Sequence, residues 1–324
     1  MVTLLTEADV RAVLTMDLAL EAVETAFRSL AAAPGRNYPR RRVSVPGGLL
    51  HFMAGAVPEL NALGLKAYAT FGGPVDFLVP FYAADTGRLL ALIEADWLGR
   101  MRTGAASGVA TKYLAQPDAR TLGLFGTGGQ AQTQLLAVCA VRPIERVHVY
   151  SRSAERRAAF VAAMQPQVSA TLVPVDDPRA AVAGLDVVTT MTTSAQPVFD
   201  GAWLSPGAHV NGAGSNQLRR RELDSATFRR AAVVTADSVE QAHFESGDLA
   251  GAVAEGALAW EQVVDFAEVL AGRAPGRAAA TDITVFESHG LAAWDVATAA
   301  LVYARALERG LGQPLPLFAR PPAE

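Results

Sequence analysis

The chain has 324 residues, of which 51% are hydrophobic, and this length exceeds what one core usually holds, so two domains are expected. The formal net charge is −4, whereas nucleic-acid-binding proteins normally carry a basic surplus. No apolar run reaches the length of a membrane span, and the first residues lack the pattern of a signal peptide. Because Cys139 is the single cysteine, a disulfide framework is excluded. We expect a cytoplasmic protein that binds neither nucleic acid nor a membrane.

The N-terminal third combines helical and extended patterns. Residues 7–30 predict two helices, because apolar residues from Leu20 to Leu30 recur at helical spacing. Between residues 41 and 95, short apolar runs alternate with Gly/Pro turns, which predicts an antiparallel sheet. These runs are Val43–Val45, Leu49–Met53, Leu65–Thr70, Phe77–Tyr82 and Leu89–Glu94. A helix of small residues is expected from about Thr103 to Leu114.

From Arg120 onward the pattern changes to an alternation of strands and helices. Strands are expected at 121–125, 146–150, 170–174, 185–191, 207–212, 232–235 and 282–287, and a last helix at about 291–309. Such alternation predicts a parallel sheet covered by helices on both faces. The expected fold class is therefore α/β, with a Rossmann-type doubly wound sheet and a second, α+β domain that contains the antiparallel sheet.

A glycine-rich loop follows the first strand of this second part. The strand Thr121–Phe125 leads into Gly126-Thr-Gly128-Gly-Gln-Ala131, and a helix continues from there. Gly126 allows a tight turn, Gly128 lets the backbone approach a pyrophosphate, and Ala131 permits close helix–strand packing. The helix N-terminus adds N–H groups and a positive dipole. We therefore predict a dinucleotide site formed by Gly126, Thr127, Gly128, Gly129, Gln130 and Ala131.

The loop after the second strand indicates which dinucleotide is bound. An Asp or Glu about 20 residues past the glycine motif usually receives a free ribose 2′-hydroxyl. This chain instead has Ser151, Arg152 and Ser153, with Arg156 nearby, and these residues suit a 2′-phosphate. The alternative interpretation is an exposed loop with ordinary arginines. We expect NADPH to be preferred, with NADH as the alternative.

Lysine use singles out one residue. Of the 28 basic residues, only Lys66 and Lys112 are lysines, and Lys66 lies in an otherwise apolar stretch. One interpretation is a surface lysine whose stem covers apolar groups. The other is a site that requires a compact, titratable ammonium.

An ordered set of motifs extends from residue 102 to residue 295. The motifs are Arg102-Thr-Gly-Ala-Ala-Ser, the glycine loop, Val188-Thr-Thr-Met-Thr-Thr193, Val210-Asn-Gly-Ala-Gly-Ser-Asn216 with Arg221-Glu-Leu-Asp224, Glu245-Ser-Gly-Asp-Leu249, and Val285-Phe-Glu-Ser-His-Gly-Leu-Ala292 ahead of Asp295. In these motifs the chain resembles the family of ornithine cyclodeaminase and mu-crystallin, which also contains an alanine dehydrogenase and reductases of cyclic imino acids. The resemblance covers nearly the whole chain.

The resemblance implies a domain arrangement and further cofactor contacts. Residues 1–115 together with 295–324 would bind substrate and form a homodimer through the antiparallel sheet, and residues 116–294 would form the Rossmann domain. The additional cofactor-binding positions are Thr103, Thr190, Met191, Thr192, Gly214, Ser288, His289 and Gly290. No chemical role follows for His289.

The resemblance also implies a substrate site. Arg42, Lys66 and Arg102 match the basic residues that hold the substrate carboxylate, a task for which a forked guanidinium is suited. His51 stands where ornithine cyclodeaminase has a Glu, and it is either structural or a proton donor to an imine nitrogen. Asn216 stands where that enzyme has an Asp that handles the substrate amines. The five histidines and one cysteine show no metal-ligand spacing, so no metal is expected.

These expectations combine into an NADPH-preferring reductase of small cyclic imino acids. Pyrroline-2-carboxylate or piperideine-2-carboxylate would receive a hydride at the carbon next to the carboxylate and yield proline or pipecolate. The catalytic proton would come from Lys66, His51 or water. Three alternatives stay open: ornithine cyclodeamination, alanine dehydrogenase chemistry, and a non-enzymatic binding role like that of lens mu-crystallin.

Overall fold

The computed structural model describes residues 2–318 and divides into two compact units. Unit 1 combines the chain up to Arg102 with the chain from Leu291 onward, and unit 2 comprises Thr103–Gly290. The first division therefore lies within helix α3 (Asp96–Leu114), ahead of the limit of 115 expected from the sequence, and the second lies ahead of 295. Helix α3 itself begins at Asp96, well before the expected Thr103. Only Ala95 separates it from the preceding strand.

Unit 1 contains a seven-stranded sheet in the order β15-β1-β6-β5-β4-β3-β2. Strands β2 to β6 are antiparallel neighbours, as predicted, but β1 pairs parallel with β6, so the sheet as a whole is mixed. Strands β1 and β15 were not expected, because they lie outside residues 41–95, the range whose pattern predicted the sheet. The strands are β1 (Val2–Leu5), β2 (Asn37–Val45), β3 (Gly48–Val57), β4 (Ala62–Thr70), β5 (Leu78–Ala83), β6 (Leu89–Glu94) and β15 (Gln313–Leu315).

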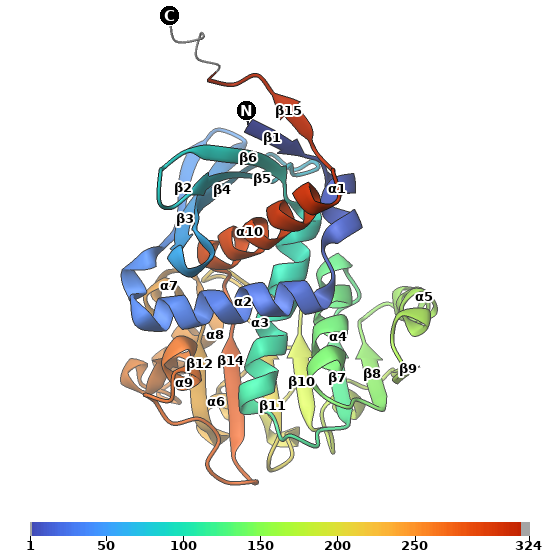
Figure 1. Ribbon diagram of the computed structural model, residues 1–324. Coiled ribbons are helices and arrows are strands. Elements are labelled where there is room, and N and C mark those ends of the chain that lie inside the picture. The colour runs from blue at the N-terminus through green and yellow to red at the C-terminus, as the bar shows by residue number, and fades with distance from the viewer. Residues whose placement is uncertain (1, 319–324) are drawn as a thin grey trace, which may run out of the picture. The chain divides into compact units, whose positions relative to one another are not determined.

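Three helices belong to unit 1, namely α1 (Glu7–Val13), α2 (Met16–Ala32) and α10 (Ala292–Glu308). Helix α10 lies against β3 and β4 (Figure 1). Gly55 of β3 permits this close approach, because a Cβ atom there would stand 2.7 Å from the backbone nitrogen of Ala293. The first turn of α10 is therefore held directly against β3.

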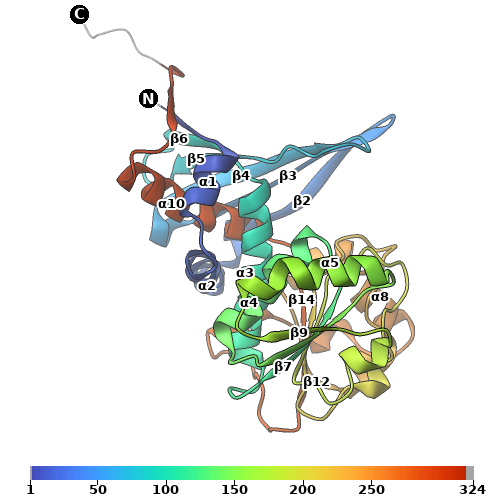
Figure 2. The ribbon, with the colours of Figure 1, turned by 90° about the vertical axis from the view of Figure 1, so that its right-hand side faces the viewer.

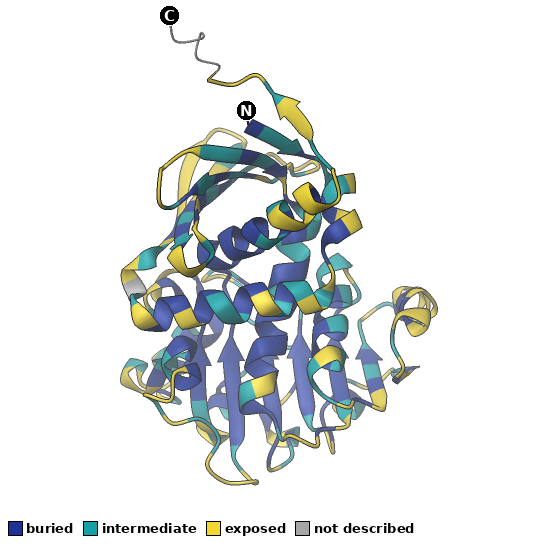
Figure 3. Ribbon diagram, in the orientation of Figure 1, coloured by how far each residue is buried: buried dark blue, intermediate teal, exposed yellow. Residues whose placement is uncertain are grey.

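The β2–β3 hairpin extends as a long ribbon (Figure 2). Apolar side chains along it are exposed, which is visible in the yellow segments of Figure 3. They are Tyr38, Val43, Val45, Leu50 and Phe52. We call this group the hairpin strip. A cluster of exposed aromatic and aliphatic residues of this kind is typical of a protein–protein interface.

Unit 2 contains an eight-stranded, fully parallel sheet in the order β13-β12-β14-β11-β10-β7-β8-β9. This architecture confirms the predicted Rossmann-type fold. The short strand β13 (Val263–Asp265) was not expected. The others are β7 (Thr121–Phe125), β8 (Arg146–Tyr150), β9 (Thr171–Pro174), β10 (Val187–Thr190), β11 (His209–Gly212), β12 (Ala231–Ala236) and β14 (Ile283–Glu287).

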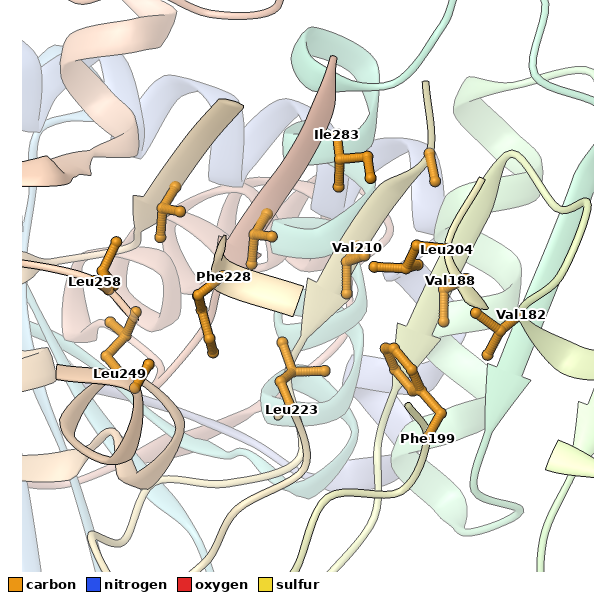
Figure 4. Close-up of a cluster of buried hydrophobic side chains, with 14 of the residues drawn as sticks. Val182, Val188, Phe199, Leu204, Val210, Leu223, Phe228, Leu249, Leu258 and Ile283 are labelled. Atoms are coloured by element: carbon orange, nitrogen blue, oxygen red, sulfur yellow. The ribbon is translucent and has the colours of Figure 1, made fainter. Parts of the chain in front are cut away.

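Both faces of this sheet are covered, and its central strands β7, β10, β11 and β14 are almost entirely buried (Figure 3). Val187 belongs to one hydrophobic cluster and its neighbour Val188 to the other, since successive strand residues point to opposite faces. Figure 4 shows the second cluster, in which Val188 and Val210 pack with residues such as Phe199 and Leu223. The helices are α4 (Gly129–Val141), α5 (Ala154–Met164), α6 (Ser225–Arg230), α7 (Val239–Glu245), α8 (Gly247–Ala254) and α9 (Phe266–Leu270).

Short 3-10 helices connect several of these elements: η1 (Pro34–Arg36), η2 (Pro58–Leu60), η3 (Gln165–Gln167), η4 (Pro178–Ala181), η5 (Gly201–Trp203) and η6 (Trp260–Gln262). Within residues 2–318, no helix has both the length and the apolar character required to cross a membrane.

Candidate functional site

The glycine loop joins β7 to α4 at the C-terminal edge of the parallel sheet. Gly126 has a φ of +109°, and a Cβ atom there would stand 2.2 Å from the carbonyl oxygen of Met191. Gly128 is the N-cap of α4, and no side chain caps the helix. The first N–H groups of this helix therefore point into a space where a phosphate would satisfy them.

A cavity of about 1150 Å³ lies beside this loop within unit 2. It is situated where the strand order reverses, because β8 and β10 flank β7 on opposite sides, and this is where open α/β sheets bind ligands. Its lining includes Gly126 to Gln130, Tyr150 to Ser153, Arg156, Met191 to Ser194, Gln196 to Val198, and Gly214. Ala131 lies in the first turn of α4 and is buried.

The loop after β8 contributes serines and arginines to this cavity. Ser153 caps α5 by accepting a hydrogen bond from the N–H of Arg156 at 3.2 Å, and the Ser151 hydroxyl donates to the carbonyl of Ser153. Arg152 and Arg156 are exposed and line the cavity. Among the described residues of the lining there is no Asp or Glu, so a negatively charged group would meet no like charge there.

Other predicted cofactor positions are distributed unevenly. Met191, Thr192 and Gly214 line the cavity, whereas Thr103, Thr190, Ser288, His289 and Gly290 are not part of its lining.

His289 is buried between two acids, with Nδ1 3.2 Å from Asp237 and Nε2 3.7 Å from Glu287. Asp237 also accepts hydrogen bonds of 2.7 Å from the backbone N–H groups of His289 and Gly290. This carboxylate thus fixes the turn after β14.

In unit 1, a buried ionic cluster joins the sheet to α10. Asp295 Oδ1 accepts hydrogen bonds from Lys66 Nζ at 2.8 Å and from Arg102 Nε at 3.0 Å. The three residues are at most 5% exposed. Asp295 Oδ2 is buried without a hydrogen-bond partner among the described residues. Burial, and then the neighbouring Arg102 guanidinium, lower the pKa of Lys66 to about 7. Burying the charged forms of Lys66 and Arg102 side by side is therefore electrostatically unfavourable.

The arginine of β2 nearest this cluster is Arg40 and not Arg42. Arg40 is buried, lies 3.8 Å from the sulfur of Met53, and its charge further lowers the pKa of Lys66. Met53 is paired with Lys66 in the sheet, so Arg40, Met53 and Lys66 form one row across three strands. Arg42 is exposed and lies in a second row, opposite His51, two residues further along the strands. Because Arg40, Arg41 and Arg42 are consecutive, the sequence alone does not indicate which of them is buried.

His51 belongs to that second row. Its ring stacks on Tyr68 with centroids 4.4 Å apart, and Nε2 lies 3.0 Å from the hydroxyl of Thr70. The imidazole is buried. His51 lies two residues along β3 from Met53, which pairs with Lys66. This placement is compatible with either of the roles considered for His51.

Asn216 follows β11 in unit 2 and is half-buried. Within the described part of the chain, no three His, Cys, Asp or Glu side chains are arranged to hold a metal ion.

The comparisons with known proteins agree with this geometry. The model of the ornithine cyclodeaminase/mu-crystallin family matches residues 1–310. The chain belongs to this family. It is 39% identical to a Delta(1)-pyrroline-2-carboxylate reductase of Bacillus cereus over 257 residues, which cover 79% of this chain and 77% of the relative. The prediction of an enzyme of the ornithine cyclodeaminase family is thereby confirmed.

Solved structures of family members have the same fold. The Delta(1)-pyrroline-2-carboxylate reductase of Thermococcus litoralis, solved with NADH and L-proline, has a TM-score of 0.89 and 35% identity, and covers 97% of this chain and 100% of its own. An archaeal alanine dehydrogenase dimer with bound NAD has a TM-score of 0.88 and 33% identity, with 98% and 99% covered. Members with different activities are thus about equally similar to this chain.

Sequence reasoning missed three residues of the site region. Arg40 was not separated from its neighbours, and Asp295 and Glu222 were noted only as parts of motifs. A signal for Asp295 was available, because it is a single carboxylate within the apolar stretch Ala292–Ala300, and buried carboxylates are almost always paired.

Proposed function

We propose that the protein is an oxidoreductase that uses a nicotinamide dinucleotide to reduce small cyclic imino acids. The observation that carries the proposal is the buried cluster of Lys66 and Arg102 on Asp295, with Arg40 beside it. Several cations around one carboxylate are unfavourable unless a further anion joins them. A substrate carboxylate is such an anion, and guanidinium groups bind it with defined geometry.

The glycine loop and the loop after β8 would together bind the dinucleotide. The residues fit the cofactor, since Gly126 adopts a φ that disfavours side chains and the uncapped N-terminus of α4 offers N–H groups to a pyrophosphate. Gly126 to Gln130 would hold the pyrophosphate, and Ser151 to Ser153 with Arg156 would hold the adenosine ribose. When bound, the reduced cofactor would supply a hydride to the carbon next to the substrate carboxylate.

The chain's own residues would orient the substrate and supply the proton. Arg102 and Arg40 would hold the carboxylate, which fixes the adjacent C=N carbon. The ammonium of Lys66 is suited to protonate the imine nitrogen, because a pKa of about 7 lies close to neutral pH, where general acids are most effective. His51 or water is the alternative donor.

Asn216 favours imine reduction over cyclodeamination. Oxidation and cyclisation of a diamino acid require free amines, which are mostly protonated at neutral pH, and a carboxylate would help by accepting a proton. The amide of Asn216 accepts none, whereas an imine requires only hydrogen bonding.

We therefore expect the purified protein to oxidise NADPH with pyrroline-2-carboxylate or piperideine-2-carboxylate, and to release little or no ammonia from ornithine with oxidised cofactor. Asn216→Asp should weaken imine reduction. An assay of cofactor absorbance and ammonia, with 2-oxo acids plus ammonia as a further arm, checks both reactions. Robust ornithine turnover without imine reduction would favour the cyclodeaminase alternative, and activity on 2-oxo acids alone would favour the dehydrogenase alternative.

We further propose that NADPH is preferred over NADH. Support comes from the hydroxyls and guanidiniums at Ser151, Arg152 and Arg156 and from a cavity lining that includes no acid among its described residues. Ser151→Asp should shift the preference toward NADH by at least about tenfold, because the new carboxylate repels a 2′-phosphate and accepts from a 2′-hydroxyl. Titration of both cofactors by fluorescence measures the effect. Tighter binding of NADH than of NADPH by the unaltered protein would contradict the proposal.

The hairpin strip supports pairing of two copies into a homodimer, as the resemblance implies. Light scattering that gave the mass of a single chain would contradict this.

A further inference from the structure

Glu222 is a fully buried carboxylate that the reaction described above does not use. It lies in the segment after β11, and its side chain contacts the loops that follow two neighbouring strands. Oε1 accepts a hydrogen bond of 2.6 Å from the N–H of Thr192, after β10. Oε2 accepts one of 2.7 Å from the N–H of Gly214, after β11, and one of 3.1 Å from the hydroxyl of Thr190.

The two loops that Glu222 joins form part of the dinucleotide cavity. Met191, Thr192 and Gly214 all line it. The carbonyl oxygen of Met191 is also the atom nearest to the position that a Cβ at Gly126 would occupy. A continuous set of contacts therefore leads from the glycine loop through Met191 and Thr192 to Glu222 and on to Gly214.

Glu222 is itself held firmly. Asp248 Oδ1 accepts hydrogen bonds from the backbone N–H groups of Glu222 at 2.7 Å and Leu223 at 2.6 Å. The carbonyl of Glu222 accepts one from the N–H of Val198, another residue of the cavity lining. Such a clamp fixes the carboxylate relative to both loops.

The packing between Glu222, Thr192 and Gly214 is tight. A Cβ atom at Gly214 would stand 2.4 Å from Glu222 Oε2 and 2.4 Å from the nitrogen of Thr192. Burial raises the pKa of Glu222 to about 7, so placing a carboxylate here is unfavourable in itself. A hydrophobic residue would avoid that cost, but it would leave two buried N–H groups without acceptors.

We propose that Glu222 is a positioning residue that joins the loops after β10 and β11 and thereby shapes the dinucleotide cavity for its ligand. This inference rests on the proposed dinucleotide site. Glu222 touches neither the substrate nor the cofactor in this account. It acts through Thr192 and Gly214, and its replacement should therefore alter cofactor binding more than substrate binding.

The test compares Glu222→Gln with Asp224→Asn in the full-length protein. Asp224, two residues further along, is also a hydrogen-bonded carboxylate, which accepts from Gly201 and Thr227 and is not part of the cavity lining. Both changes replace an acid by its amide and should lower the melting temperature. In Glu222→Gln, the new side-chain amide would present its NH₂ group to one of the two N–H donors, so one loop would lose its acceptor.

We expect Glu222→Gln to weaken NADPH binding by at least about tenfold, and Asp224→Asn to change it by less than about twofold. In steady-state kinetics, Glu222→Gln should raise the KM for NADPH and leave the KM for the imino acid nearly unchanged. If Glu222→Gln does not fold, Thr190→Val removes one donor to the same carboxylate and should weaken binding in the same direction.

The outcomes separate this inference from the proposed function. If the unaltered protein binds neither NADPH nor NADH, the proposed function fails. If it binds a dinucleotide and Glu222→Gln, or Thr190→Val in its place, binds it equally well, only the positioning role of Glu222 is overturned. Equal weakening by Asp224→Asn would also overturn it, because the effect would then reflect a general loss of stability.

Discussion

Lys66→Met should abolish most of the imine reduction while leaving dinucleotide binding intact. The methionine keeps the length of the side chain but removes the ammonium that contacts Asp295 at 2.8 Å. Cutting one partner from a buried, hydrogen-bonded charge pair costs ~2–5 kcal/mol. At 1.36 kcal/mol per factor of ten, kcat/KM should fall by about 30-fold to 5,000-fold. Binding of NADPH should survive, because Lys66 belongs to unit 1 and the cavity belongs to unit 2.

The matched control is Lys112→Met, which removes the other lysine of the chain. Lys112 is exposed, so its replacement should leave kcat/KM within about twofold of the unaltered enzyme, as is usual for surface substitutions. Steady-state kinetics and a fluorescence titration with NADPH, performed on the same preparations, give both quantities. Near-normal turnover of Lys66→Met would show that the substrate site has been misplaced.

The pH profile adds a second readout for Lys66. A lysine with a pKa of about 7 is mainly an ammonium below pH 7 and mainly a neutral amine above it. If the ammonium donates the proton, kcat/KM should decrease as pH rises through this range. Lys66→Met should lose that decrease together with most of the activity.

Gly126→Ala should abolish dinucleotide binding. The added Cβ atom would stand 2.2 Å from the carbonyl oxygen of Met191, at a φ of +109° that side chains rarely adopt. The glycine loop, the loop after β10, or both must move, and each lines the cavity. Since the pyrophosphate depends on close backbone approach, we expect binding to weaken by more than about 100-fold, a loss of ~3 kcal/mol.

Gly184→Ala is the control for backbone strain. Gly184 also has a positive φ, +78°, but a Cβ atom there meets nothing within 4 Å. Both variants carry the strain of a left-handed residue, of about 1–3 kcal/mol, and only Gly126→Ala displaces the cavity wall. Calorimetric titration with NADPH alongside thermal unfolding distinguishes them. Normal NADPH binding by a folded Gly126→Ala would remove the glycine loop from the proposed site.

Local pattern was sufficient to predict the parallel sheet and its glycine loop. The central strands β7, β10 and β14 are buried on both faces, so they appear in the sequence as apolar runs between helices, and the loop requires glycine at fixed spacing. By contrast, β1 and β15 lie outside the ranges in which the two sheets were expected, and β13 has only three residues. Such strands are defined by their pairing partners, which the sequence does not reveal.

The site was less predictable, because its members meet only in three dimensions. Lys66 could be singled out by lysine use, but Asp295 lies 229 positions away, and only the packing of α10 on β4 brings them together. The choice between Arg40 and Arg42 depends on the register of β2 with β3, which contains an irregularity between Tyr38 and Arg41. Glu222 escaped notice because its partners are mostly backbone N–H groups.

The most direct measurement supplies the protein with pyrroline-2-carboxylate and NADPH deuterated at the transferred position of C4, and analyses the product by mass spectrometry. We expect proline with one deuterium at the α-carbon and one NADPH oxidised per proline formed. Proline and ammonia from ornithine with no net change in cofactor, and no deuterium transfer to the imine, would contradict it.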